Sequence, residues 1–239
     1  MHNTVKAGLA ALMMAFTLLV TSGGASFGQD YQKGLEAAQT GDYVTAVPEW
    51  GPRAEQGDAR AQVNLGVMYA TGQGVTQDYS EAVKWYRKSA EQGNATAQYN
   101  LGQVYREGQG VGQDYSEAVK WYRKSAEQGD ASAQYNLGWM HDKGLGVTQD
   151  YTEAMKWYQK SAEQGVAEAQ YSLGQMYAKG QGITQDNVYA HMWWNIVAST
   201  GYAQATKDRD AIEKRMTAAD ISKAQELARM CVRNHYEGC

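Results

Sequence analysis

Apolar and polar positions between residues 58 and 201 follow a helical period in two alternating kinds of segment. In the first kind, Ala61, Leu65, Met68 and Tyr69 lie within about 100° of one another on a helix that turns by about 100° per residue. In the second kind, apolar residues gather on one side and charged residues such as Lys84 on the other. The pattern predicts pairs of amphipathic helices that bury their apolar sides against each other.

The helix pairs belong to a repeat of 36 residues. Residues 77–93 return unchanged at 113–129, and the copy at 149–165 differs only at Thr152, Met155 and Gln159. An aspartate recurs at the same interval, at Asp42, Asp78, Asp114, Asp150 and Asp186. Periods of this size mark stacked arrays, in which each unit relies on its neighbours to cover its apolar face. We therefore expect an all-α fold built as an α/α solenoid.

The repeat sets the expected organisation of the chain. Full units run over residues 58–93, 94–129, 130–165 and 166–201. Residues 29–57 form a shorter, atypical helix pair with Trp50 in the place of Tyr86, which we interpret as an N-terminal cap. After Gly201 the repeat residues are lost, so the array is expected to stop there. Residues 202–239 then form C-terminal capping helices and a tail.

Glycine and tryptophan recur at fixed places in each unit. Paired glycines such as Gly72 and Gly74 are interpreted as stops of the first helix, because glycine accepts the left-handed backbone that ends a helix. Gly66 lies in the middle of that helix, where it costs roughly 1 kcal/mol relative to alanine. Its position predicts the close approach of another helix. The tryptophan of each unit, such as Trp85, is interpreted as a wedge between repeats.

The N-terminus has the pattern of an export signal. Lys6 precedes an apolar stretch, Ala7–Val20, and a run of small residues follows. We expect residues 1–25 to be a signal peptide cut after Ala25, and the mature protein to be periplasmic or secreted. The apolar stretch is too short to span a bilayer, so no membrane span is expected after cleavage.

Charge and cysteine content narrow the expected chemistry. The net charge of −4 offers no basic surface of the kind that nucleic acids require. The only two cysteines of the sequence, Cys231 and Cys239, lie near the C-terminus, and export would permit a disulfide between them. No nucleophile motif or metal-ligand spacing appears, and His141 takes the place of a core tyrosine. We expect no catalytic residue, no metal and no cofactor, and nothing in the pattern requires more than a monomer.

These residues resemble the Sel1-like repeat family over about residues 43–201. The second full unit supplies the family pattern with Ala97, Gln98, Leu101, Gly102, Tyr105, Gly108, Gly110, Val111, Asp114, Ala118, Trp121 and Gly129. The resemblance implies a right-handed superhelix related to tetratricopeptide arrays, which holds other proteins in a concave groove. Cysteine-rich relatives linked to penicillin binding or hydrolysis carry a cysteine pair in each repeat, which this chain lacks.

One face of the first helices varies between units while the apolar residues stay the same. By the resemblance this face lines the concave side, and we expect a partner to bind at Tyr99, Gln103, Arg106, Tyr135, Trp139, Asp142, Tyr171 and Gln175. The tyrosines could instead lean on the neighbouring repeat. Trp139 has no aromatic counterpart in the other units.

Three functions remain open from the sequence. The first is an exported, non-catalytic scaffold that binds a protein or peptide in the groove. The second is a module that binds cell-wall sugar or peptide, since aromatic faces suit sugar rings as well as side chains. The third and most remote is a β-lactam-type hydrolase.

Overall fold

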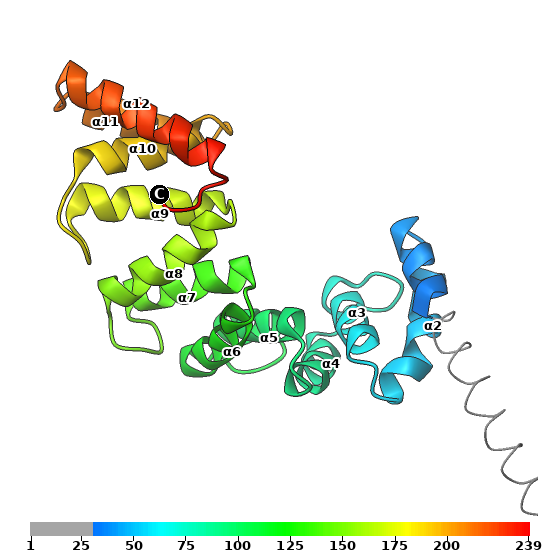
Figure 1. Cartoon of the computed structure of the whole chain (residues 1–239). Coiled ribbons are helices and arrows are strands. Elements are labelled where there is room, and N and C mark those ends of the chain that lie inside the picture. Colours follow the sequence, from blue (N-terminus) through cyan, green and yellow to red (C-terminus); the bar gives the residue numbers. More distant parts are fainter. Residues whose placement is uncertain (1–30) are drawn as a thin grey trace, which may run out of the picture. The chain divides into compact units, whose positions relative to one another are not determined.

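The computed structural model describes residues 31–239, and the expected signal peptide lies outside this range. The described chain contains helices and no strands (Figure 1). Residues 31–39 are helical, and the helices that follow are α2 (Tyr43–Glu55), α3 (Ala59–Thr71), α4 (Tyr79–Glu91), α5 (Ala95–Glu107), α6 (Tyr115–Glu127), α7 (Ala131–Lys143), α8 (Tyr151–Glu163), α9 (Ala167–Lys179), α10 (Asn187–Ala198), α11 (Ala203–Glu213) and α12 (Ala218–Arg233).

The helices divide into two compact units, one ending at Asn94 and the other beginning at Ala95. The first contains residues 31–39 and α2 to α4, and the second contains α5 to α12. Within the units, consecutive helices pack as the pairs α3–α4, α5–α6, α7–α8 and α9–α10. We call the first member of each pair the A helix and the second the B helix. The expected all-α, α/α solenoid fold is confirmed.

Each B helix begins at a capping aspartate. The Asp78 carboxylate accepts hydrogen bonds from the backbone N–H groups of Ser80 and Glu81 at 2.8 and 3.1 Å, which satisfies two of the free amides at the start of α4. In the third full unit, α7 ends at Gly144, whose φ of 67° is left-handed. The Gln149 side chain then donates to the Asp142 carbonyl at 2.7 Å and ties the loop to the end of α7. Local sequence therefore fixes where these helices start and stop.

The glycine in the middle of the A helix faces an aromatic ring of its B helix. A Cβ atom on Gly102 would lie 2.7 Å from the ring of Tyr122, and one on Gly66 only 2.4 Å from Tyr86. These contacts confirm the predicted close approach. Gly34 makes the same approach to Trp50, so the helix pair at residues 31–55 keeps the repeat's internal packing although its loop is shorter.

Side-chain hydrogen bonds join helices both within a pair and between successive pairs. Gln134 is 5% exposed and donates from Nε2 to the carbonyl of Ala126, in the preceding B helix, at 3.1 Å. Its Oε1 accepts a hydrogen bond from Gln164 at 2.8 Å. Ser161 of α8 donates to the Ala131 carbonyl at the start of α7, at 2.7 Å. The bond from Gln134 to Ala126 fixes the register of α7 on the preceding pair, and the other two bonds hold α8 on α7 within one pair.

The repeat tryptophans take up different degrees of burial. Trp157 is 7% exposed and belongs to an apolar cluster that includes α6 of the preceding pair, as a wedge between repeats requires. Trp193 is fully buried, whereas Trp85 and Trp121 are half-buried. The ammonium groups of Lys88 and Lys124 cover those two rings at 4.1 and 4.2 Å from the ring centres.

Two helices, α11 and α12, follow the last full unit, which ends at Gly201. α11 keeps the repeat register, because Ala205 and Ile212 are buried at the places of Ala169 and Met176. α12 packs instead against α10, which it covers with Ala228 and Cys231. Within residues 31–239, no helix combines the length and apolar character needed to cross a bilayer.

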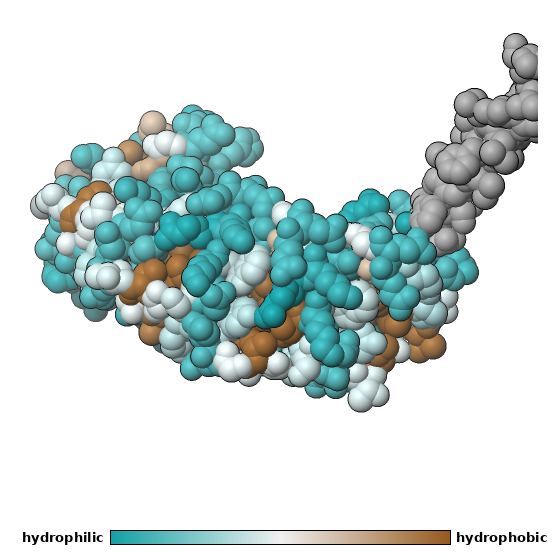
Figure 2. Space-filling model, turned by 90° about the horizontal axis from the view of Figure 1, so that it is seen from below, coloured by the Kyte–Doolittle hydropathy of each residue, from teal (hydrophilic) through white to brown (hydrophobic). Residues whose placement is uncertain are grey.

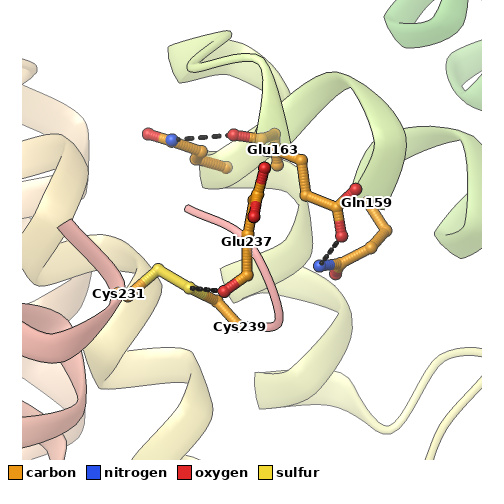
Figure 3. The surroundings of a disulfide bond; sticks show 7 residues. Gln159, Glu163, Cys231, Glu237 and Cys239 are labelled. Atoms are coloured by element: carbon orange, nitrogen blue, oxygen red, sulfur yellow. Dashed lines mark hydrogen bonds between the residues drawn. A yellow bond between two sulfur atoms is a disulfide. The ribbon is translucent and has the colours of Figure 1, made fainter. Parts of the chain in front are cut away.

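A disulfide joins Cys231 of α12 to Cys239 at the end of the chain. Figure 3 shows it with Glu237 beside Gln159 and Glu163 of α8. The ring of Tyr236 comes within 3.5 Å of a Cβ atom built on Gly165, at the turn between α8 and α9. The tail therefore lies over the α8–α9 turn.

Candidate functional site

A groove between the A helices α7 and α9 brings together many of the side chains expected to bind a partner. We call it the A-helix groove, and it consists of two adjoining pockets of about 250 and 130 Å³. The larger pocket is lined by Tyr135, Trp139, Asp142, Lys143, Tyr158, Glu168, Tyr171, Ser172, Gln175 and Tyr202. Asp142, Lys143, Tyr158, Ser172 and Gln175 also line the smaller one. Of the expected site, the groove therefore collects Tyr135, Trp139, Asp142, Tyr171 and Gln175.

The tyrosines of the groove lean on rings of their own helix pair. Tyr135 of α7 lies 5.7 Å from Tyr158 of α8, measured between ring centres, and Tyr171 of α9 lies 6.5 Å from Trp194 of α10. Tyr171 also contacts a ring beyond its own helix pair, that of Tyr202, with the ring centres 5.2 Å apart. Among these ring contacts, the one between Tyr171 and Tyr202 is the contact with a neighbouring segment that the alternative described. The packing holds each half-buried ring in a fixed orientation.

Hydrogen bonds hold the polar side of the larger pocket. The Tyr171 hydroxyl donates to Asp208 of α11 at 2.6 Å and accepts from Gln175 at 3.1 Å. Burial and the bond to Asp208 raise the pKa of Tyr171, so the hydroxyl keeps its proton at neutral pH. Asp142 pairs with Lys143 at 2.7 Å. The pocket therefore combines aromatic surface with polar groups whose positions are fixed before a ligand arrives.

Three of the expected residues lie outside both pockets, on α5. Tyr99 packs on Tyr122 at 5.9 Å between ring centres, and the Gln103 side chain donates to its hydroxyl. Arg106 donates to Asn136 of α7 at 2.8 Å and lies 6.0 Å from the centre of the Trp139 ring. Arg106 therefore reaches the groove through Trp139, whereas Tyr99 and Gln103 take part in packing within their own pair.

The expected site did not include Lys143, Tyr158, Glu168, Ser172 or Tyr202, which also line the larger pocket. One sequence signal pointed to Tyr202: full units begin with Asp58, Asn94, Asp130 or Val166 at that place, and a tyrosine there breaks the pattern. The tyrosine makes no side-chain capping bond to α11. Its ring instead closes one side of the pocket.

His141 and His191 are the buried histidines of the described chain, and neither lies in the groove. Burial and the nearby Arg123 guanidinium, 3.2 Å from Nε2, hold the pKa of His141 below its usual value. His191 contacts Glu213 at 2.7 Å. Among residues 31–239, no group of three or more His, Cys, Asp or Glu side chains is placed to hold a metal ion.

Polar surface surrounds small apolar patches on the face shown in Figure 2. The A-helix groove follows the same principle on a local scale, since its rings are bordered by Asp142, Glu168 and Gln175. A mixture of apolar and polar surface is typical of interfaces that form and dissociate, whereas permanent interfaces are more apolar.

Comparison with known proteins identifies the repeats. The Sel1 repeat model matches residues 59–94, 95–130, 131–166 and 167–199. A crystal structure of a Sel1 repeat protein from Oxalobacter formigenes is 32% identical, with a TM-score of 0.73, and the match covers 85% of each chain.

A second similar structure is c5321, a protective antigen present in uropathogenic Escherichia coli strains, which displays an SLR fold. It is 30% identical over 82% of this chain and 50% of its own length, with a TM-score of 0.54. A search among curated proteins found no match. Sel1 repeat proteins are generally protein-interaction scaffolds. The helix pairs, the glycine–ring contacts and the match of the repeat model over most of the array together place this chain in the Sel1 repeat family.

Proposed function

We propose that this protein is an exported, non-catalytic scaffold that holds a protein or peptide partner in the A-helix groove. The observation that carries the proposal is the groove itself, where Trp139, Asp142 and Glu168, each unlike its counterparts in the other units, line the larger pocket. Residues that the repeat needs for packing recur from unit to unit, so variable residues gathered in one groove are free to serve recognition. Export is supported by the signal-like sequence of residues 1–25.

Trp139 is the expected anchor. Its ring is half-buried, is held next to Arg106 and has Tyr135 one helical turn away on the same A helix. Tryptophan and tyrosine dominate the binding energy of many interfaces because they bury a large area at a small cost in side-chain entropy. A partner that inserts between α7 and α9 would cover this ring.

Crosslinking in cells tests the proposal. A photoreactive amino acid at position 139 should capture a partner that one at position 121 does not, because Trp121 lies on the B helix α6. With the captured partner purified, Trp139→Ala should weaken binding at least about tenfold, whereas Trp121→Ala should change it less than about twofold. Thermal melts of both variants check that each remains folded.

Two results would contradict the proposal. Unchanged affinity of the Trp139→Ala, Tyr135→Ala double variant would exclude the groove as the binding site. Retention of the protein on peptidoglycan stripped of protein, lost in the same variant, would replace the protein partner by the cell wall. N-terminal sequencing of the protein from a periplasmic fraction tests the export step, and an intact Met1 would argue against it.

A further inference from the structure

The charges around the larger pocket of the A-helix groove do not cancel. Asp142 is paired with Lys143 at 2.7 Å, and Arg106, next to the pocket, is paired with Glu107 at 2.5 Å. Glu168 also lines the pocket and is exposed, and no lysine or arginine of residues 31–239 forms an ion pair with it. The pocket is thus left with an uncompensated carboxylate.

The same pocket is lined by aromatic rings from three segments of the chain. Trp139 and Tyr135 come from α7, Tyr171 from α9 and Tyr202 from the start of α11. The faces of such rings attract cations, and a neighbouring carboxylate adds to the attraction. Trp139 already has one such contact, since the Arg106 guanidinium lies 6.0 Å from its ring centre. Rings and carboxylate therefore favour the same kind of ligand, a cation with apolar surface.

The size of the pocket restricts that ligand to something small. Its volume of about 250 Å³ is below the range of about 300–1,000 Å³ that is usual for sites of free small molecules. One long side chain of a partner would fill it, with the partner's backbone outside along the groove.

We propose that this pocket accepts an arginine side chain of the partner. The planar guanidinium stacks on aromatic faces and binds a carboxylate through two parallel N–H groups, whereas the ammonium of lysine acts as a point charge. The guanidinium would lie among Trp139, Tyr135 and Tyr171 and donate to the free Glu168 carboxylate. This inference rests on the proposed function, of which it names the ligand.

Short peptides test the inference without the natural partner. The probes are acetyl-Gly-Arg-Gly-amide, its lysine analogue and its citrulline analogue, which keeps the shape of arginine without the charge. Each is titrated into the full chain, and the indole N–H signal of Trp139 is followed by NMR, with Trp139→Phe assigning the signal. We expect saturable shifts with arginine, weaker binding of lysine and at least about fivefold weaker binding of citrulline.

Glu168→Gln provides the matched variant, because Glu168 is exposed and glutamine keeps its shape. We expect it to weaken arginine binding about two- to fivefold and to leave citrulline binding unchanged. Equal binding of arginine and citrulline, or no saturable shift at Trp139, would overturn the inference. If a captured partner binds in the groove but the three peptides bind equally well, the arginine inference is wrong while the proposed function stands. If arginine binds while no partner crosslinks at position 139, the proposed function fails alone.

Discussion

The mid-helix glycine and the ring that it faces act as one packing pair. In an ordinary helix, replacing glycine by alanine stabilises by roughly 1 kcal/mol. At Gly102 the added methyl group would lie 2.7 Å from Cδ1 of Tyr122 and 3.0 Å from Cγ, so a ring, rather than the flexible end of a side chain, would have to move. Overpacking of this kind costs roughly 1–3 kcal/mol.

Gly102→Ala is therefore expected to lower the free energy of unfolding by about 1 kcal/mol, against the helix propensity. Urea unfolding followed by circular dichroism measures it. Gly112→Ala is the control, since nothing lies within 4 Å of its added methyl group, and its effect should stay within about 0.5 kcal/mol. A Gly102→Ala protein as stable as the parent would show that the ring moves freely.

His141 stands at a place where the other full units have Tyr69, Tyr105 and Tyr177. Because burial and Arg123 lower its pKa in the folded protein, the unfolded chain takes up a proton near pH 6.5 while the folded chain does not. The free energy of unfolding is therefore higher above the pKa that His141 has in the unfolded chain, and it falls as the pH drops below that value. Nδ1 is also buried without a hydrogen-bond partner, which costs further stability.

His141→Tyr should raise the melting temperature by about 1–4 °C at pH 5.5 and by less at pH 8. Thermal melts at the two pH values measure the difference. The reverse substitution in the preceding pair, Tyr105→His, is the matched control and should add a loss of stability on acidification. An equal gain of His141→Tyr at both pH values would contradict this assignment.

At the scale of elements, α12 and the tail form the least repetitive part of the chain. α12 packs against α10. The disulfide between Cys231 and Cys239, which are eight positions apart, closes a short loop that lies over the α8–α9 turn. In the chain-entropy account, closing so short a loop stabilises by about 2–3 kcal/mol.

Reduction should therefore lower the melting temperature and open the tail to protease near Tyr236, which loses its place against Gly165. Melts and limited proteolysis with and without dithiothreitol measure both effects. The Cys231→Ala, Cys239→Ala variant should match the reduced protein and show no response to dithiothreitol. Identical digestion of the oxidised and reduced protein would mean that contacts other than the disulfide hold the tail.

The helices themselves could be predicted from the sequence because their signals are local. Asp78 and its equivalents cap the starts of the B helices, and the loop glycines end the A helices. The apolar period identifies the buried side of each helix. The repeat leucine and glycine are replaced by Arg209 and Asp210 in α11, and this helix nevertheless keeps the register of an A helix. Ala205 and Ile212 are buried in a cluster with residues of α10, a contact that local sequence does not reveal.

At the scale of the whole molecule, some residues of the candidate site could be predicted from the sequence and others are brought to it only by tertiary structure. The sequence placed Tyr135, Trp139 and Tyr171 on the helix face whose residues vary most between units. It could not show that Tyr202, 63 positions after Trp139 in the chain, closes the same pocket. Nor could it separate Tyr99, which packs inside its pair, from Tyr135, which lines the groove.

The sequence by itself determined the repeat, the helix pairs, the buried side of each helix and the family, because each depends on residues within one unit of 36 positions. Tertiary structure decided the ring that each mid-helix glycine faces, the return of α12 onto α10 and the side chains that share the A-helix groove. These features depend on contacts between residues far apart in the chain, where packing selects one arrangement among several that the same local pattern allows.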